Sequence, residues 1–453
     1  MLISKNPHND KVIAEYQEYN FTQVKDIISD VVLEQSSWSR LTYKDRSDFI
    51  LCISQTLESE KKNLSELITE EMGKPISESM LEIEKCIWLC QYYSEKIDEF
   101  LTPEVIKTDA KLSEIHFEPL GVILGVMPWN FPYWQVFRFI VPALLAGNGV
   151  LLKHASNVQG CALQIEKVLI DSGLPENIFR TLVIGSKVIP DIIKDDAVKA
   201  VSLTGSEFAG SSVAELAGKN LKKSVMELGG SDAFIVLDDC DIEKAVKGAV
   251  TARMINNGQS CIAAKRFILS KSIHDEFVDK LIDSIGALKI GNPMNLSTDV
   301  GPLAKNEFLD DILRQIEKSI LMGAKLVSGG VKIGESGYYM RPAILTNVTE
   351  SMPVFNEETF GPVFSIVSCD NIEQMIKVAN NSDYGLGGSV WTQNIELGKS
   401  IAHQIETGAV FVNAFTKSDP RMPFGGVKKS GYGRELSRYG LLEFCNIKSI
   451  SIF

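Results

Sequence analysis

The chain has 453 residues, of which 45% are hydrophobic and 23% are charged, and its formal net charge at pH 7 is −12. This length exceeds one ordinary domain and predicts two or three domains with a large buried core. The negative charge argues against general nucleic-acid binding, and no apolar run is long and unbroken enough to span a bilayer.

The first hundred residues have the pattern of helices. Apolar side chains recur with 3.6-residue spacing within 21–31 and 50–67, and the run Gly73-Lys74-Pro75 ends the second of these segments. Residues 103–118 alternate weakly between apolar and polar types, which predicts a β-hairpin arm. The last 20 residues, ending KSISIF, predict a strand that could add to the sheet edge of another subunit.

Short apolar runs alternate with helical segments from Gly121 onward, the pattern of βαβ units and a parallel sheet. In the first series we expect strands in GVILGV, GVLLKH, TLVIG and AVSLTG, with a helix over 162–172. A second series starts near Ala233, with strands in FIVLDD, FILS, ILTNV, FSIVS, GGSVWT and GAVFVN. Its helices fit around 241–255, 273–287, 304–322 and 371–380. The predicted fold class is therefore α/β.

Two strand ends carry residues suited to binding a dinucleotide. The run VKAVSLTGSEFAG predicts a strand, a turn and a helix, and places Gly205 and Ser206 where backbone N–H groups at a helix start bind phosphate. Lys153 ends the strand predicted in GVLLKH, where a lysine would reach a crevice or a ligand. Each feature alone also fits ordinary structure: a Gly-Ser turn, or a lysine stem lying along the surface.

Cys261 and Glu227 supply the thiol nucleophile and the carboxylate base that are needed to form and then hydrolyse a thioester. Cys261 follows the polar run GQS, which is unlike the approach to a core strand. Glu227 lies between two apolar residues and before a Gly-Gly pair, where burial would raise its pKa toward values that suit a base. A buried structural cysteine and a salt-bridged glutamate remain the alternatives.

Asn130 and Glu358 are two further candidates. Asn130 lies between the two prolines of PWNFP, which fix the loop, so its amide could donate to an oxyanion; the alternative is a turn asparagine. Glu358 precedes FGP and suits either a ribose hydroxyl or a turn cap. Cys86 and Cys90 share a helix face, but no further ligands accompany them, so we predict no metal site.

Together these motifs resemble one family, the NAD(P)-dependent aldehyde dehydrogenases. The resemblance covers essentially the whole chain and is carried by PWNFP, MELGG and GQSC, with support from EETFGPV, PFGG and GYGRE. It implies a Rossmann-type dinucleotide-binding domain in residues 1–102 and 119–228 and an α/β catalytic domain in 229–431. It also implies an oligomerisation arm in 103–118 and 432–453, built from the hairpin and the C-terminal strand.

The resemblance also implies roles for matching positions. Cys261 would be the nucleophile and Glu227 the general base, while Asn130 and the backbone N–H of Cys261 would stabilise an oxyanion. Six positions match the family's dinucleotide-binding residues: Lys153 and Glu358 at the ribose hydroxyls, Gly205 and Ser206 at the pyrophosphate, and Trp129 and Leu228 beside the nicotinamide. The implied reaction oxidises an aldehyde to a carboxylic acid through a thiohemiacetal and a thioester on Cys261.

The residue three positions after Lys153 bears on the choice of cofactor. A common family pattern has a glutamate there, which contacts the adenosine ribose. This chain reads Lys153-His154-Ala155-Ser156, so Ser156 replaces the carboxylate and nothing negative repels a 2′-phosphate. We therefore expect the protein to accept NADP, with the use of NAD left open.

The runs LLKHASN, CALQIE, GGSDAFIVL and GGVKKSGYGRELS are similar to those of short bacterial succinate-semialdehyde dehydrogenases. A substrate with a distal carboxylate needs a cation, and Arg138 and Ser418 are the expected substrate-binding residues. A structural ion pair is the alternative role for Arg138. Some relatives have another arginine where this chain has Ile255, which indicates either looser substrate selectivity or a different anchor, such as Lys417.

Two other functions remain open: transfer of the acyl group to phosphate or coenzyme A, and a non-catalytic structural or binding role. The presence of Glu227 favours hydrolysis over acyl transfer. Eight scattered cysteines and an N-terminus without an apolar signal segment predict a cytoplasmic protein. We expect a small aldehyde as the ligand, a homodimer or homotetramer as the assembly, and no nucleic-acid or membrane partner.

Overall fold

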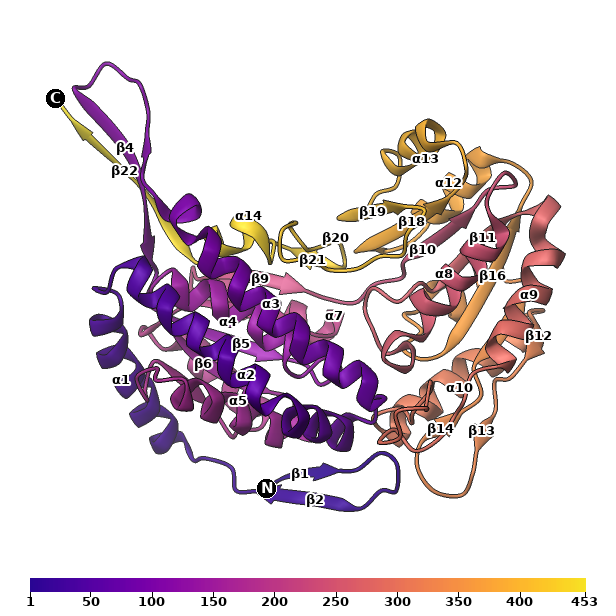
Figure 1. The fold of residues 1–453 in the computed structure, drawn as a ribbon, viewed down its shortest axis with the longest axis horizontal. Coiled ribbons are helices and arrows are strands. Elements are labelled where there is room, and N and C mark those ends of the chain that lie inside the picture. The colour runs from indigo at the N-terminus through magenta and orange to yellow at the C-terminus, as the bar shows by residue number, and fades with distance from the viewer.

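The computed structural model describes residues 1–453 as two α/β lobes and a long arm (Figure 1). The first lobe contains a six-stranded sheet with the strand order β21-β9-β8-β5-β6-β7. Its parallel strands are β5 Val122–Met127, β6 Gly149–His154, β7 Phe179–Thr181, β8 Val198–Thr204 and β9 Lys223–Glu227. Numbered from β5 in chain order, they lie in the order 3-2-1-4-5, the doubly wound arrangement of dinucleotide-binding folds. The expected α/β class is confirmed.

Helices cover both faces of this sheet, because neighbouring strand residues point to opposite sides. Ile123 packs in the core that α2 to α5 share, whereas Val122 packs with α1, α6 and α7. These helices are α1 Phe21–Trp38, α2 Tyr43–Met72, α3 Ile76–Leu101, α4 Trp134–Leu145, α5 Gln159–Asp171, α6 Ile189–Lys194 and α7 Glu207–Lys219. α2 ends at Gly73, whose φ of 85° is a left-handed cap conformation that suits glycine.

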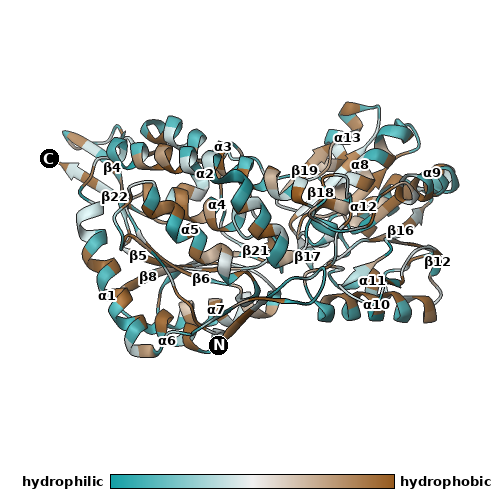
Figure 2. Ribbon diagram, turned by 60° about the horizontal axis from the view of Figure 1, so that its bottom comes forward, coloured by the Kyte–Doolittle hydropathy of each residue, from teal (hydrophilic) through white to brown (hydrophobic).

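The second lobe has a seven-stranded sheet with the order β12-β15-β16-β11-β10-β18-β19. Its strands are β10 Ala233–Val236, β11 Arg266–Ser270, β12 Lys325–Ser328, β15 Ala343–Thr346, β16 Val363–Cys369, β18 Gly387–Trp391 and β19 Ala409–Val412. Only β12 is antiparallel. The helices are α8 Ile242–Met254, α9 His274–Gly286, α10 Asn306–Leu321, α11 Pro353–Asn356, α12 Ile372–Asn380 and α13 Ile395–Ala402. Figure 2 shows hydrophilic and hydrophobic turns alternating along α10, whose apolar stripe is buried.

The arm projects from the first lobe and ends near the C-terminus (Figure 1). It consists of β3 Glu104–Val105, β4 Leu112–Pro119 and β22 Cys445–Ile452 in the order β22-β4-β3. β22 pairs antiparallel with β4 over its eight residues, so it forms a sheet with a strand of its own chain. The expectation of a strand over the last 20 residues was too long, because α14 Ser437–Leu442 occupies part of that segment. Seven of the eight β22 residues are exposed, and one edge of this strand remains unpaired.

Several elements depart from the sequence prediction. The run TLVIG lies mostly beyond its strand, since β7 ends at Thr181. The N-terminal hairpin of β1 Leu2–Lys5 and β2 Val12–Tyr16 was not expected, and the Ser4 hydroxyl anchors it by donating to Glu71. Short strand pairs also form between β13 Lys332–Ile333 and β14 Tyr339–Met340, and between β17 Tyr384–Gly385 and β20 Val427–Lys428. β21 Gly431–Tyr432 returns the chain to the first sheet, antiparallel to β9. None of the helices combines the length and apolar character needed to cross a bilayer.

A buried ion pair fixes the start of α4, the helix that follows the PWNFP loop. Glu82 on α3 accepts hydrogen bonds from the backbone N–H groups of Tyr133 and Trp134 at 2.8 and 2.9 Å. Its other carboxylate oxygen pairs with Lys74, and both side chains are almost completely buried. The Lys74 ammonium also lies 4.2 Å from the ring centroid of Phe131 in the same loop. One carboxylate therefore neutralises a buried cation and binds the positive end of a helix.

Replacement of Lys74 by methionine should lower the thermal unfolding midpoint. The change leaves the Glu82 carboxylate buried without its cation, and breaking a buried pair in this way costs about 3–5 kcal/mol. The double variant Lys74→Met/Glu82→Gln should recover part of the loss, because glutamine removes the stranded charge while its carbonyl still accepts from the helix start. Calorimetry of the three proteins checks this order, and a Lys74→Met midpoint equal to that of the wild type would contradict it.

Candidate active site

The loop after β5 carries the first site residues. Pro128 and Trp129 follow the last residue of β5, and the Asn130 side chain is buried before α4 begins. The Asn130 amide nitrogen donates one hydrogen bond, to the Gln259 carbonyl at 3.0 Å. Its second N–H has no acceptor in the protein and remains available to a ligand. Trp129 stacks on Phe308 of the second lobe with ring centroids 4.7 Å apart, so this loop contacts both lobes.

A left-handed turn delivers Cys261. α8 ends at Met254, and the next turn contains Asn256, Asn257 and Gly258 with φ values of 53°, 56° and 79°. Asparagine and glycine tolerate this region best. Gly258 is required for a second reason, since a Cβ there would lie 2.4 Å from the backbone carbon of Gly361. The sequence NNG thus turns the chain sharply before the cysteine.

The two asparagine side chains tie this turn to distant backbone. The Asn256 amide donates to the Asn130 carbonyl at 2.6 Å, which links the turn to the PWNFP loop. The Asn257 amide donates to the Pro302 carbonyl at 3.0 Å and more weakly to the Gly73 carbonyl at 3.3 Å. Its oxygen accepts from the Gly301 N–H at 2.8 Å. The turn is therefore held by both lobes.

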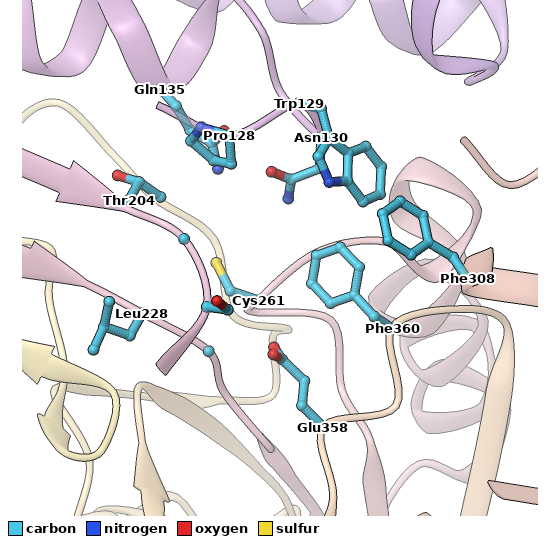
Figure 3. A pocket seen from close by; sticks show the side chains of 13 residues that line it. Pro128, Trp129, Asn130, Gln135, Thr204, Leu228, Cys261, Phe308, Glu358 and Phe360 are labelled. Atoms are coloured by element: carbon cyan, nitrogen blue, oxygen red, sulfur yellow. The ribbon is translucent and has the colours of Figure 1, made fainter. Parts of the chain in front are cut away.

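Cys261 is half-buried, and burial raises the pKa of its thiol to about 12, while the charges of Arg138 and Lys265 act in the opposite direction. Lys265 was not singled out from the sequence, although it follows the cysteine by four residues. Its ammonium donates to the carbonyls of Ser260, Cys261 and Ala263 at 2.9 to 3.1 Å. The Cys261 N–H donates to no protein group. This leaves a backbone donor next to the sulfur, and the Asn130 and Cys261 side chains line the same cavity (Figure 3).

Glu227 is the last residue of β9, and its carboxylate is buried without any hydrogen-bond partner. Burial and the nearby charge of Glu435 hold its pKa well above the usual range, while Arg138 acts in the opposite direction. Glu435 itself forms a buried ion pair with Arg138. A Cβ placed on Gly425 would lie 2.7 Å from a Glu227 carboxylate oxygen, so the carboxyl group lies beside the PFGG turn. It lines neither of the two cavities that reach Cys261.

A cavity of about 210 Å³ leads to the cysteine between the lobes (Figure 3). The first lobe contributes Trp129, Asn130, Leu228 and the Gly205-Ser206 turn, and the second lobe contributes Phe308, Glu358 and Phe360. Ser206 is the N-cap of α7, so unpaired backbone N–H groups at this helix start face the same region. Glu358 accepts a hydrogen bond from the Gly230 N–H at 2.9 Å, and its nearer oxygen lies 3.8 Å from the Lys265 ammonium.

The cavity fits part of a dinucleotide. A helix start is suited to the pyrophosphate, aromatic and aliphatic walls are suited to the nicotinamide, and the Glu358 carboxylate is suited to a ribose hydroxyl. Lys153 and Ser156 do not line this cavity; they lie at the end of β6 and in the short turn Ser156–Val158. Burial and the nearby charge of Lys305 lower the pKa of Lys153. Lys153 at the end of β6 and Lys305 just before α10 therefore lie near each other as two cations, and neither belongs to an ion pair.

A second cavity, of about 460 Å³, also reaches Cys261. Only Cys261 and Gln135 line both cavities, so the sulfur lies at their junction. Arg138, Lys417 and Ser418 line the second cavity together with apolar side chains. The sequence left open whether Arg138 binds substrate or forms a structural ion pair, and the structure gives it the ion pair with Glu435 while leaving it in the cavity wall. Ser418 accepts a hydrogen bond from Lys85, a residue that the sequence pattern did not single out.

The arrangement places a thiol between an opening that fits part of a dinucleotide and a separate cavity. An oxyanion that forms beside the sulfur can be met by the Asn130 amide and the Cys261 N–H. The structure contains no group of three or more His, Cys, Asp or Glu side chains that could hold a metal ion. The eight cysteines are all unpaired.

Comparison with known proteins gives one consistent result. The model of the aldehyde dehydrogenase family matches residues 2–450. A probable succinate-semialdehyde dehydrogenase (NADP+) of Synechocystis is 49% identical over 416 residues, which cover 92% of each chain. Succinate-semialdehyde dehydrogenase (NADP+) 1 of Mycobacterium bovis is 41% identical over 450 residues, 99% of this chain and 98% of the relative. The crystal structure of succinic semialdehyde dehydrogenase from Streptococcus pyogenes, in complex with NADP+, is 36% identical, has a TM-score of 0.98 and covers 100% of both chains.

Proposed function

The chain belongs to the aldehyde dehydrogenase family, and we propose that it oxidises succinate semialdehyde to succinate with NADP+. The observation that carries this proposal is the position of Cys261 at the junction of two cavities. One cavity would hold the nicotinamide end of the cofactor and the other the aldehyde, so both reactants would meet at the sulfur. The names of the similar proteins from Synechocystis, Mycobacterium and Streptococcus support the choice of substrate and cofactor.

The reaction would begin with attack of the Cys261 sulfur on the aldehyde carbon. The thiol proton passes to solvent, the thiolate sulfur forms a C–S bond with the carbonyl carbon, and the carbonyl oxygen becomes an oxyanion. The free N–H of the Asn130 amide and the Cys261 N–H would stabilise that charge. One such donor is typically worth about 100- to 1,000-fold in rate.

Trp129 and Leu228 would hold the nicotinamide, whose chemistry would be to accept a hydride, and an acyl thioester would then remain on Cys261. Glu227, after losing its proton to solvent, would take a proton from water, and the water oxygen would displace the sulfur. The carboxylate lies beside Gly425 in the structure, so we propose that it turns toward the cavity wall at Leu228 and Gly229 for this step. The balance is one aldehyde, one NADP+ and one water converted to one acid, one NADPH and one proton.

Arg138 and Ser418 are the proposed substrate-binding residues in the second cavity. The Arg138 guanidinium would face the distal carboxylate while Glu435 holds its Nε side, and Ser418 would donate a hydrogen bond. Lys153 and Ser156 are proposed to meet the adenosine ribose and its 2′-phosphate. The neighbouring charge of Lys305 supports an anion at this end of the sheet, and Ser156 brings no carboxylate to repel it.

The arm and the domain limits are also part of the proposal. We assign residues 1–102 and 119–228 to dinucleotide binding, 229–431 to catalysis, and 103–118 with 432–453 to assembly. The unpaired edge of β22 and its exposed residues support an interface with a second copy, in a homodimer or homotetramer. Eight unpaired cysteines support a reducing cytoplasm as the compartment.

A panel of aldehydes tests the proposed function. Succinate semialdehyde with NADP+ should yield succinate without added phosphate or coenzyme A. Its kcat/KM should exceed that of butanal about 10- to 100-fold, since hydrogen bonds to a charged group contribute about 1.5–3 kcal/mol each. Equal kcat/KM values for the two aldehydes would contradict the substrate assignment. A requirement for either acyl acceptor would favour acyl transfer.

Glu227→Gln should slow steady-state turnover about 100- to 10,000-fold, the usual contribution of a general base. The first turnover should still release NADPH, because hydride transfer precedes the hydrolysis that Glu227 assists. The raised pKa of Glu227 means that wild-type turnover should increase with pH well above about 4.3, the value for an ordinary glutamate, and the variant should lack this limb. Rapid-mixing absorbance at several pH values measures both phases. Loss of the first-turnover NADPH would place Glu227 before hydride transfer instead.

Ser156→Glu should shift the enzyme from NADP+ toward NAD+. The new carboxylate would face the 2′-phosphate, and a like-charge contact of this kind costs several kcal/mol, on the order of 100-fold in kcat/KM for NADP+. The value for NAD+ should fall little or rise. Ser156→Gln has nearly the same size without the charge and should keep the preference for NADP+. An unchanged ratio in Ser156→Glu would remove Ser156 from the cofactor assignment.

A further inference from the structure

We propose that Lys85 is a second binding residue for the distal carboxylate of the substrate, acting together with Ser418 in the wall of the second cavity. This inference rests on the proposed oxidation of succinate semialdehyde and names a cation that the family motifs do not assign. Lys85 lies on α3, outside every motif that identified the family.

Three elements bring Lys85 to the cavity. Its ammonium donates a hydrogen bond to the Ser418 hydroxyl at 2.7 Å, and Ser418 is buried in the segment between β19 and β20. The same ammonium lies 4.3 Å from the ring centroid of Trp134 at the start of α4. Lys85, Trp134, Arg138 and Ser418 all line the cavity that ends at Cys261. The hydrogen bond and the ring contact hold the cation in one place.

Lys85 has no counterion. Two carboxylates are near enough to influence it, Glu82 on the same helix and Asp419 on the Ser418 segment. Glu82 is committed to Lys74 and to the start of α4, and Asp419 is paired with Arg421 at 2.7 Å. No carboxylate lies within ion-pair distance of the Lys85 ammonium itself. A half-buried cation without a partner is costly, and a substrate carboxylate would remove that cost.

Arg138 differs from Lys85 in having a counterion. It is the other cation close to Lys85 in this wall, but Glu435 already balances its charge. Burial together with the charge of Arg138 lowers the pKa of Lys85 to about 8, while Cys86, Asp419 and Glu82 act weakly in the other direction. An anion placed between Lys85, Arg138 and Ser418 would be attracted by two cations and one hydroxyl.

The cavity is also polarised along α3. Glu78 lies seven residues before Lys85, which is two helical turns or about 10 Å along the axis. It lines the same cavity and accepts a hydrogen bond from the Asn256 N–H at 2.6 Å. Ile255 is another lining residue, at the position where some relatives have an arginine. The segment before the cysteine has no arginine, and Lys85 on α3 supplies a positive charge to the cavity instead. Lys85 lies two helical turns from Glu78, so the two opposite charges are separated along the helix.

The test compares Lys85→Met with wild type on two substrates. Methionine has nearly the length of lysine and no charge. We expect kcat/KM for succinate semialdehyde to fall about 10- to 100-fold, mainly through KM, because a charged hydrogen bond is lost. Butanal has the same four carbons without the carboxylate, and its kcat/KM should change less than about threefold. Lys96→Met, on the exposed side of the same helix, is the matched control and should leave both values unchanged.

A pH series separates charge from packing. In the wild type, KM for succinate semialdehyde should rise above about pH 8, because Lys85 loses its proton there, while KM for butanal should not follow. Lys85→Arg should keep anion binding and abolish this rise, because arginine stays protonated. Equal losses on both aldehydes in Lys85→Met would assign Lys85 a structural role and overturn the proposal.

Failure of the proposed function and failure of the proposed role of Lys85 would give different results. If the wild type itself does not prefer succinate semialdehyde to butanal, the proposed function fails first. If the wild type shows that preference and Lys85→Met keeps it, the proposed function stands and the role of Lys85 is wrong. A loss of the preference in Lys417→Met, with none in Lys85→Met, would place the anchor at Lys417 instead.

Discussion

The position of the Cys261 sulfur depends on the left-handed turn of Asn256, Asn257 and Gly258. Three consecutive residues with positive φ are strained unless the surroundings hold them. Here the asparagine amides reach the PWNFP loop and the backbone of both lobes, and Gly258 passes too close to Gly361 for any side chain. The turn therefore fixes how the two lobes meet, and it also fixes the position of the cysteine. Because the cavities on either side of Cys261 are lined by both lobes, this one turn aligns the proposed cofactor opening with the proposed aldehyde cavity.

The pairing of buried charges is a second constraint on the structure. Lys74 is paired with Glu82 and Arg138 with Glu435, and these pairs fix the start of α4 and the wall behind Glu227. Glu227 is left without a hydrogen bond or a cation of its own, and its raised pKa follows from that isolation. A carboxyl group with a raised pKa binds its proton more tightly than an ordinary glutamate, so its carboxylate is a stronger base for water. The unpaired charges lie where the proposed reaction needs them, and the paired charges hold the framework.

Much of the fold could be predicted from the sequence. The alternation of short apolar runs with helical segments predicted both parallel sheets, and every strand named after Ala233 forms. α4 was not predicted, although Gln135 and Arg138 lie three residues apart on one face, because all of its residues are buried and most of them are apolar. The N-terminal hairpin was missed because its stability comes from a contact between Ser4 and Glu71, which no local pattern records. β22 joins the hairpin of residues 103–118, as the resemblance implied, and pairing of its free edge with another subunit stays a prediction.

The site likewise contains some residues that the sequence predicted and others that only the fold brings to it. Motifs named Cys261, Glu227 and Asn130, but Lys265, Glu435 and Lys85 emerged only from the fold, because their partners are distant in sequence or belong to the backbone.

Alkylation of the native protein with iodoacetamide, mapped by mass spectrometry, tests the central claim that Cys261 is open to a small reactant. The account predicts label on Cys261 and on the exposed Cys52, with protection of the buried Cys86, Cys90 and Cys161. Labelling of Cys261 should keep rising with pH beyond about 8.5, the value for a free thiol, because burial raises its pKa. Label on Cys261 only after unfolding would mean that no aldehyde reaches the sulfur, and would contradict the account.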